Sequence, residues 1–166
     1  NGFDVENTPS VLNGVGERVS STLVRSALER GDVLAAQANM GHSVSLSGRV
    51  VHGQQLGRKL GFPTANVHLK GIKSALSGVY AVTLEADGVS HNGVANIGVR
   101  PTVQGKTPIL EVHVFDFNGD LYDKYVQVTF CQFIRSERKM AGLEALEKQI
   151  QCDKEEALRF FVQSVN

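Results

Sequence analysis

Several features that would point away from an ordinary globular domain are missing from this 166-residue sequence. It has no tryptophan and only two cysteines, Cys131 and Cys152, which are too few to suggest a disulfide framework. No segment is typical of a signal peptide or a membrane span, so a reducing cytoplasm is the simplest setting. The formal net charge is zero and aromatic residues make up only 7% of the chain. This composition disfavours a basic groove with aromatic platforms for single-stranded nucleic acid.

Acidic residues are also missing from one long internal stretch. Residues 33 to 84 contain no Asp or Glu, although the chain as a whole has as many acidic as basic side chains. The same stretch carries five cations: Arg49, Arg58, Lys59, Lys70 and Lys73. A local basic field without an overall excess indicates a compact anionic ligand rather than a nucleic-acid backbone.

Within that stretch, residues 57 to 66 read GRKLGFPTAN, a basic pair between two glycines followed by an extended segment. Pro63 disfavours helix at Phe62, so the chain should enter Thr64 already extended. Thr64 and Asn66 then lie on one face of a strand and present two neutral oxygens. Such oxygens suit Mg²⁺ that arrives with the phosphates of a nucleotide. An ordinary glycine-rich hairpin with a surface basic pair remains the alternative.

The remaining pattern predicts one main domain dominated by short strands, with helices at both ends. Short runs of β-type residues, separated by glycine-containing breaks, predict strands at 43–52, 63–69, 78–86, 89–97, 109–117 and 124–135. Strands at this spacing are typical of a sandwich or barrel. A helix should begin near Ser20 and end near Gly31, and Asp32 should cap a second helix through Ala38. Near the C-terminus, two apolar stripes and a possible capping pair, Asp153 and Glu156, predict two further helices packed on the strands. The stripes comprise Leu143, Leu146 and Ile150, then Leu158, Phe161, Val162 and Val165.

Glu111 is the candidate general base. Leu110, Val112 and Val114 should share one face of the strand, which places Glu111 and His113 on the other. A carboxylate there can accept a proton from a substrate hydroxyl if its geometry is right. An exposed strand Glu with no catalytic part is the alternative, and His113 is more often structural than catalytic.

The order of several short motifs resembles that of the riboflavin kinases. GFPTAN at 61–66 is followed by GVYAV at 78–82, ANIGVRPT at 95–102, LEVHVFDF at 110–117, DLY at 120–122 and RSERK at 135–139. The resemblance covers roughly residues 44 to 163. It implies a mainly β fold, a six-stranded antiparallel Greek-key barrel with C-terminal helices and a short helical N-terminal extension. It also implies transfer of the γ-phosphate of ATP to the 5′-hydroxyl of riboflavin, giving FMN and ADP.

The resemblance further implies site residues, carried over by position. Glu111 matches the catalytic base, and Thr64 and Asn66 match the Mg²⁺ residues. The ATP-binding positions correspond to Gly53, Arg58, Thr64, Val114, Asp116 and Tyr122. The flavin-binding positions correspond to Arg135, Arg138 and Met140. One departure from the family pattern is Asp123, which stands where a glycine is usual, so the turn there is expected to differ.

The first 41 residues resemble another protein module. VSSTLVR at 19–25, followed by Gly31-Asp32, is similar to the closing motif of the adenylyltransferase module that precedes the kinase in bifunctional bacterial flavin-synthesis enzymes. We therefore expect residues 1–41 to be a remnant of that module and residues 42–166 to be the kinase domain. The module's His-containing nucleotide motif is absent, so no FMN adenylyltransferase activity is expected from this chain.

Two other function classes stay open on the sequence. A barrel could bind flavin without turnover, although the joint presence of Thr64, Asn66 and Glu111 argues against it. A small barrel could instead bind single-stranded nucleic acid, which the low aromatic content disfavours. We expect riboflavin and ATP as ligands, no nucleic-acid or membrane partner, and a monomer.

Overall fold

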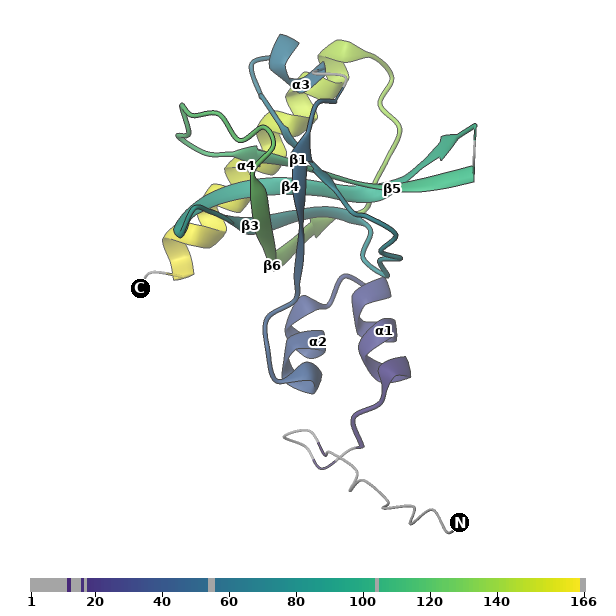
Figure 1. Cartoon of the computed structure of the whole chain (residues 1–166). Helices are drawn as coiled ribbons and strands as arrows, with labels where there is room; N and C mark the ends of the chain where they lie inside the picture. Colours follow the sequence, from purple (N-terminus) through teal and green to yellow (C-terminus); the bar gives the residue numbers. More distant parts are fainter. Residues whose placement is uncertain (1–11, 13–15, 17, 54–55, 104, 165–166) are drawn as a thin grey trace.

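A computed structural model describes residues 12, 16, 18–53, 56–103 and 105–164, apart from the side chains of Leu56 and Thr102. Its centre is a closed antiparallel barrel of six strands, in the spatial order β1-β2-β5-β4-β3-β6 (Figure 1). β3, β4 and β5 follow one another as hairpins and β6 returns beside β3, which is a Greek key. The expected barrel is thus confirmed. Its strands are β1 (Ser45–Val51), β2 (Ala65–His68), β3 (Gly78–Ala86), β4 (Val89–Thr102), β5 (Gly105–Val114) and β6 (Tyr125–Arg135).

The barrel interior is filled by one alternate set of strand side chains. Leu110 and Val112 of β5 are buried there, as expected from the alternation, together with Ala65 and Val67 of β2. Tyr80 is fully buried, stacks edge-on against Phe130 and donates its hydroxyl to the carbonyl oxygen of Ser77 at 3.0 Å. Since the interior is taken up by packed side chains, ligand sites must lie at the barrel's ends or on its outer face.

Both predicted N-terminal helices are present, and the second ends at Met40, two residues beyond the predicted Ala38. α1 (Ser21–Glu29) is capped by the Ser20 hydroxyl, and α2 (Val33–Met40) by the Asp32 carboxylate, which accepts from the Ala35 amide at 3.0 Å. Between them Gly31, at φ +76°, lies against the Phe133 ring, which leaves no space for a Cβ. The pair therefore packs beside β6, at the end of the barrel remote from α3 (Figure 1). Most of residues 1–19 lie outside the described part of the chain.

The glycine-rich segment contains a short helix, which its composition did not predict. α3 (Leu56–Lys59) carries the basic pair Arg58 and Lys59. The Phe62 amide donates back to the carbonyl oxygen of Gly57 at 2.8 Å. A Cβ at residue 57 would collide with the carbonyl oxygen of Phe62, so glycine allows this close return. The turn fixes the chain direction just before Thr64.

The C-terminal prediction of two helices is wrong, because a single helix, α4 (Leu143–Ser164), runs through the expected break (Figure 1). Asp153 lies in the middle of it, 4% exposed, and is not a cap. The predicted stripes are wrong in part, since Leu143, Leu158 and Val162 are exposed. Asp153 and Ala157 are instead the buried positions, and α4 packs on β3, β4 and β6.

Candidate functional site

Two cavities lie beside β2 and β5. The smaller cavity, of about 230 Å³, lies on the outer face of the barrel between the strands and α4, and its lining includes Asn96, Glu111 and His113. The larger cavity, of about 590 Å³, is lined by residues such as Arg58, Val114 and Tyr122. Thr64 lines both. The two cavities therefore meet at the strand segment that the sequence singled out.

A row of residues crosses five strands on the outer face and includes Glu111. By strand register, Glu111 lies directly between Asn66 of β2 and Asn96 of β4, and Asn96 is followed by Val79 and then Arg135. Residues paired across neighbouring strands share a face, so these side chains point outward together. Pairing thus brings together one predicted metal residue, the predicted base and a predicted flavin residue.

The Glu111 carboxylate is half-buried and paired with a cation that the sequence reasoning did not assign. Arg100 donates to Glu111 Oε2 at 3.1 Å. The ion pair orients the carboxylate within the smaller cavity, which Arg100 also lines. The signal was present in the motif at 95–102, but only the strand pairing of β4 with β5 shows that Arg100 reaches Glu111.

Thr64 and Asn66 differ in their surroundings. Thr64 lies at the junction of the cavities, whereas Asn66 lies beside Glu111 with its amide against Gly53, where a Cβ would collide with it. Glycine at position 53 thus leaves space around the Asn66 amide. Asn66 is not among the lining residues of either cavity, so of the two side chains only Thr64 lines the larger cavity. Their two neutral oxygens suit Mg²⁺ that takes most of its other ligands from phosphates and water. No cluster of three or more His, Cys, Asp or Glu suited to a metal occurs in the described residues.

The predicted ATP-binding residues do not all line the larger cavity. Arg58, Thr64, Val114 and Tyr122 do. Gly53 and Asp116 are not among the lining residues, and Asp116 adopts φ +52° in the turn after β5. His52 stacks on Tyr122, with ring centroids 3.9 Å apart, and was not expected from the sequence.

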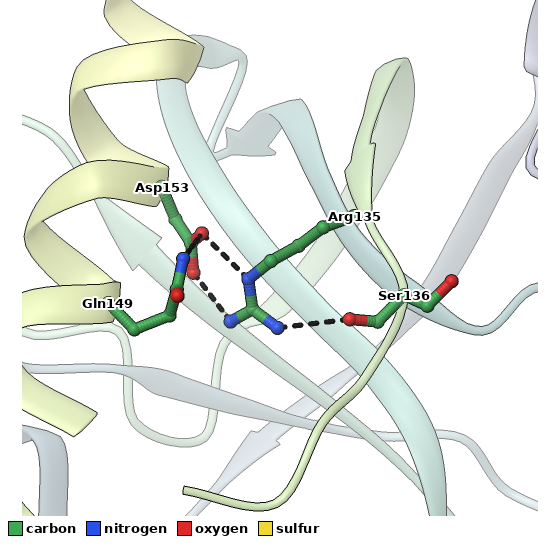
Figure 2. A network of polar contacts seen from close by, with 4 residues as sticks. All are labelled: Arg135, Ser136, Gln149 and Asp153. Carbon is green, nitrogen blue, oxygen red and sulfur yellow. Dashed lines mark hydrogen bonds and ion pairs between the residues drawn. The ribbon is translucent and has the colours of Figure 1, made fainter. Parts of the chain in front are cut away.

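The predicted flavin-binding residues Arg135, Arg138 and Met140 all line the smaller cavity. Figure 2 shows that Arg135 is held by α4: its Nε and Nη2 donate to the two carboxylate oxygens of Asp153, at 2.8 and 2.7 Å. Gln149 also donates to Asp153, at 2.9 Å, and Arg135 Nη1 donates to the carbonyl oxygen of Ser136. Arg135 thus joins the end of β6 to α4 and forms a fixed wall of the cavity. Asp153 is a second residue that the sequence reasoning did not assign to the site.

Two buried acceptor atoms also belong to this cavity. Among the described residues, Asn96 Oδ1 and His113 Nε2 are the buried side-chain atoms without a hydrogen-bond partner. His113 is 8% exposed, and its Nδ1 lies 2.9 Å from the carbonyl oxygen of Pro63. Burial lowers the pKa of His113 below its usual value, and the positive charge of Lys154 on α4 lowers it further, against the opposing effect of the Pro63 hydrogen bond.

Comparison with known proteins shows the family of this chain. The Flavokinase family model, described as riboflavin kinase, matches residues 40–161. The chain belongs to the riboflavin kinase family. Over 154 residues it is 51% identical to the bifunctional riboflavin kinase/FMN adenylyltransferase of Pseudomonas fluorescens, covering 92% of this chain and 49% of that protein. The protein of the same name from Escherichia coli (strain K12) is 47% identical over 163 residues, covering 96% and 51%. The chain thus spans about half the length of these curated relatives.

A solved structure shares the fold of this chain over almost its whole length. It is described as a macrolide-efflux protein from Streptococcus pneumoniae, with a TM-score of 0.80 and 35% sequence identity over 92% of this chain and 50% of that one. The efflux in this name is said of that protein alone. In the described part of the present chain, no helix combines the length and apolar character needed to cross a membrane.

Proposed function

We propose that this chain transfers the γ-phosphate of ATP to the 5′-hydroxyl of riboflavin, giving FMN and ADP. The observation that carries the proposal is the meeting of the two cavities at Thr64, with Glu111 in the smaller one. A phosphoryl transfer requires two ligands whose reacting ends meet. ATP in the larger cavity and riboflavin in the smaller one satisfy that requirement. The family match and the curated relatives support the same reaction.

The residues divide into roles on each side of the junction. Arg58 contributes positive charge beside the phosphates, and Val114 and Tyr122 form the wall of the nucleotide site. Gly53 acts indirectly, through the space it leaves around Asn66. Asp116 contributes through the turn that ends β5.

Thr64 and Asn66 would hold Mg²⁺, which supplies charge neutralisation to the phosphates when bound. Both contribute neutral oxygens, so most of the metal's remaining ligands would come from ATP and water. Asn66 pairs directly with Glu111 across β2 and β5, and Thr64 lies two residues before Asn66, which supports a metal and its phosphates next to the proposed base.

Glu111 orients the ribityl 5′-hydroxyl and accepts its proton as the oxygen attacks the γ-phosphorus. Arg100 holds Oε2 in place. Arg135, Arg138 and Met140 form the flavin side of the cavity, where Arg135 contributes as a rigid wall because Asp153 already binds its guanidinium. Positioning and charge neutralisation supply most of the rate enhancement, as is general for phosphoryl transfer.

The whole protein is proposed to carry a second activity. The relatives are bifunctional by name and about twice as long as this chain, so residues 1–41 would be the end of an adenylyltransferase module followed by the kinase domain at 42–166.

Cys131 and Cys152 are both unpaired, which supports a location in the reducing cytoplasm.

The test is a chromatographic assay of the purified chain with riboflavin, ATP and Mg²⁺. FMN should form, EDTA should abolish its formation, and no FAD should appear. Riboflavin binding without FMN formation would contradict the kinase proposal and favour a non-catalytic flavin-binding barrel. FAD formation would contradict the assignment of residues 1–41 as an inactive remnant.

A further inference from the structure

We propose that Asn96 Oδ1 and His113 Nε2 accept hydrogen bonds from hydroxyl groups along the ribityl chain of riboflavin, and so select a polyhydroxylated substrate. This inference rests on the proposed function and deepens it. It begins with the two orphan acceptors, which lie in the same cavity as Glu111. A buried acceptor without a donor costs free energy, so each requires a donor from outside the protein to offset that cost.

The chemistry of His113 is set by its other nitrogen. A backbone carbonyl can only accept a hydrogen bond, so Nδ1, 2.9 Å from the Pro63 oxygen, carries the proton. In the neutral ring Nε2 is then an acceptor. Burial and the nearby charge of Lys154 both disfavour a second proton. The Nε2 atom therefore has an unused lone pair, which matches a hydroxyl donor.

Strand geometry places the acceptors at a useful spacing. Asn96 is the direct cross-strand neighbour of Glu111, and His113 follows Glu111 by two residues on the same face. Residues i and i+2 of a strand are roughly 6.6 Å apart. Three acceptors spread over that distance face a chain with several hydroxyls better than they face a single hydroxyl group. They also disfavour an anionic group, since none of the three atoms can donate.

The acceptors lie beside the cavity's cations without being paired to them. Arg100 is bound to Glu111 and Arg135 to Asp153, at 3.1 and 2.7 Å. Neither guanidinium group donates a hydrogen bond to the two orphan atoms. The side-chain hydroxyls of riboflavin are the donors that the proposed function brings to this cavity, whereas the nucleotide occupies the larger one.

Two substitutions at His113 separate its two nitrogens. His113→Asn places an amide NH₂ near the position of Nδ1, so it keeps the donor to Pro63 and loses the acceptor at Nε2. His113→Gln places its amide near Nε2, so it can present an oxygen there and loses the donor to Pro63. Asn96→Ala removes the other acceptor. His68→Asn is the matched control, because His68 is exposed on β2 and lines neither cavity.

The experiment measures the dissociation constants of riboflavin and of lumiflavin, which carries a methyl group in place of the ribityl chain, by flavin fluorescence. His113→Asn and Asn96→Ala should each weaken riboflavin binding by about 3- to 10-fold, the size of one hydrogen bond. Lumiflavin and ATP affinities should stay unchanged. His113→Gln should keep more of the riboflavin affinity while its melting temperature falls, and His68→Asn should match wild type.

Equal riboflavin affinity in wild type, His113→Asn and Asn96→Ala would overturn the inference, and so would equal losses for riboflavin and lumiflavin. Either result would mean that the orphan atoms are met by water or serve packing alone. Failure of the proposed function is distinguishable, because it shows in the wild-type protein as absence of FMN formation, whereas failure of this inference shows only when the variants are compared with wild type.

Discussion

The two faces of β5 show how one strand builds both a core and a site. Leu110 and Val112 point into the barrel and are 1% and 0% exposed, among apolar neighbours. Glu111 and His113 point outward, beside ion pairs and an unpaired acceptor atom. The inner face is packed and apolar, whereas the outer face carries the ion pair of Glu111 with Arg100 and a His113 Nε2 atom without a hydrogen-bond partner. Under the proposed function, stability and activity therefore depend on alternate residues of the same strand.

The largest effect is expected for Glu111→Gln, which removes the proposed base and keeps its size. FMN formation should fall by about 10²- to 10⁴-fold, the usual contribution of general acid–base catalysis. The free energy of unfolding should change little, because the residue is half-exposed and its partner Arg100 is exposed. Initial rates at saturating riboflavin and ATP, with urea unfolding in parallel, check both statements. Full turnover would remove the base assignment.

Asp153→Leu should produce the largest loss of stability on the outer face. It leaves the Arg135 guanidinium, only 15% exposed, without its carboxylate. Breaking such a buried pair costs about 3 kcal/mol, and the double variant with Arg135→Met should recover part of it. The surface pair Lys148–Glu144 is the control, since Glu144→Leu should change the unfolding free energy by less than about 1 kcal/mol. No recovery in the double variant would mean that Asp153 acts independently of Arg135.

Tyr80 of β3 lies in the barrel interior, and the variant Tyr80→Phe tests that interior at high pH. Burial raises the pKa of Tyr80 to about 12, against the smaller lowering effect of its hydrogen bond to Ser77. In the unfolded chain the phenol loses its proton near pH 10. The contribution of Tyr80 to the free energy of unfolding is therefore fully present below pH 10 and is lost as the pH rises from 10 to 12. Between these pH values, unfolding free energy should fall less steeply in Tyr80→Phe than in wild type. Equal slopes would mean that the phenol is not protected in the core.

Asp123 tests a position that belongs to neither face and should give the smallest effect. It adopts φ +61°, a conformation that glycine accepts readily, and its amide donates to the carbonyl oxygen of Val50 at 3.0 Å. The turn therefore retains a left-handed residue despite the departure from glycine. Asp123→Gly should change the unfolding free energy by less than about 0.5 kcal/mol, and Asp123→Ala should cost about 1 kcal/mol. Equal stability of the two variants would mean that the backbone rearranges.

Much of the barrel could be predicted from local pattern. Alternation fixes which face each residue takes, so the burial of Val67 and Val112 and the outward position of Glu111 follow directly. The capping residues Ser20 and Asp32 were readable for the same reason, since each acts within three residues of its partner. Local rules succeed where the interacting groups are close in sequence.

The missed parts depend on distant contacts. Asp153 resembles a helix boundary in sequence, yet Arg135 of β6 satisfies its charge and lets α4 continue through it. His113 bonds to Pro63, 50 residues earlier, so its fixed tautomer could not be read from β5 alone. Spacing within one element carries no information on such partners.

The most direct test of this account is to measure FMN formation and unfolding free energy together for Leu110→Ala and Glu111→Gln on β5 and for Val67→Ala on β2, since Val67 is buried in the barrel and lines neither cavity. The outer residue should lose turnover and keep stability. The inner residues should lose about 1 to 5 kcal/mol of stability, and their folded fraction should keep turnover within a few-fold of wild type. Turnover that falls in step with stability at all three positions, or a fully active Glu111→Gln, would contradict the division of β5 into a structural and a catalytic face.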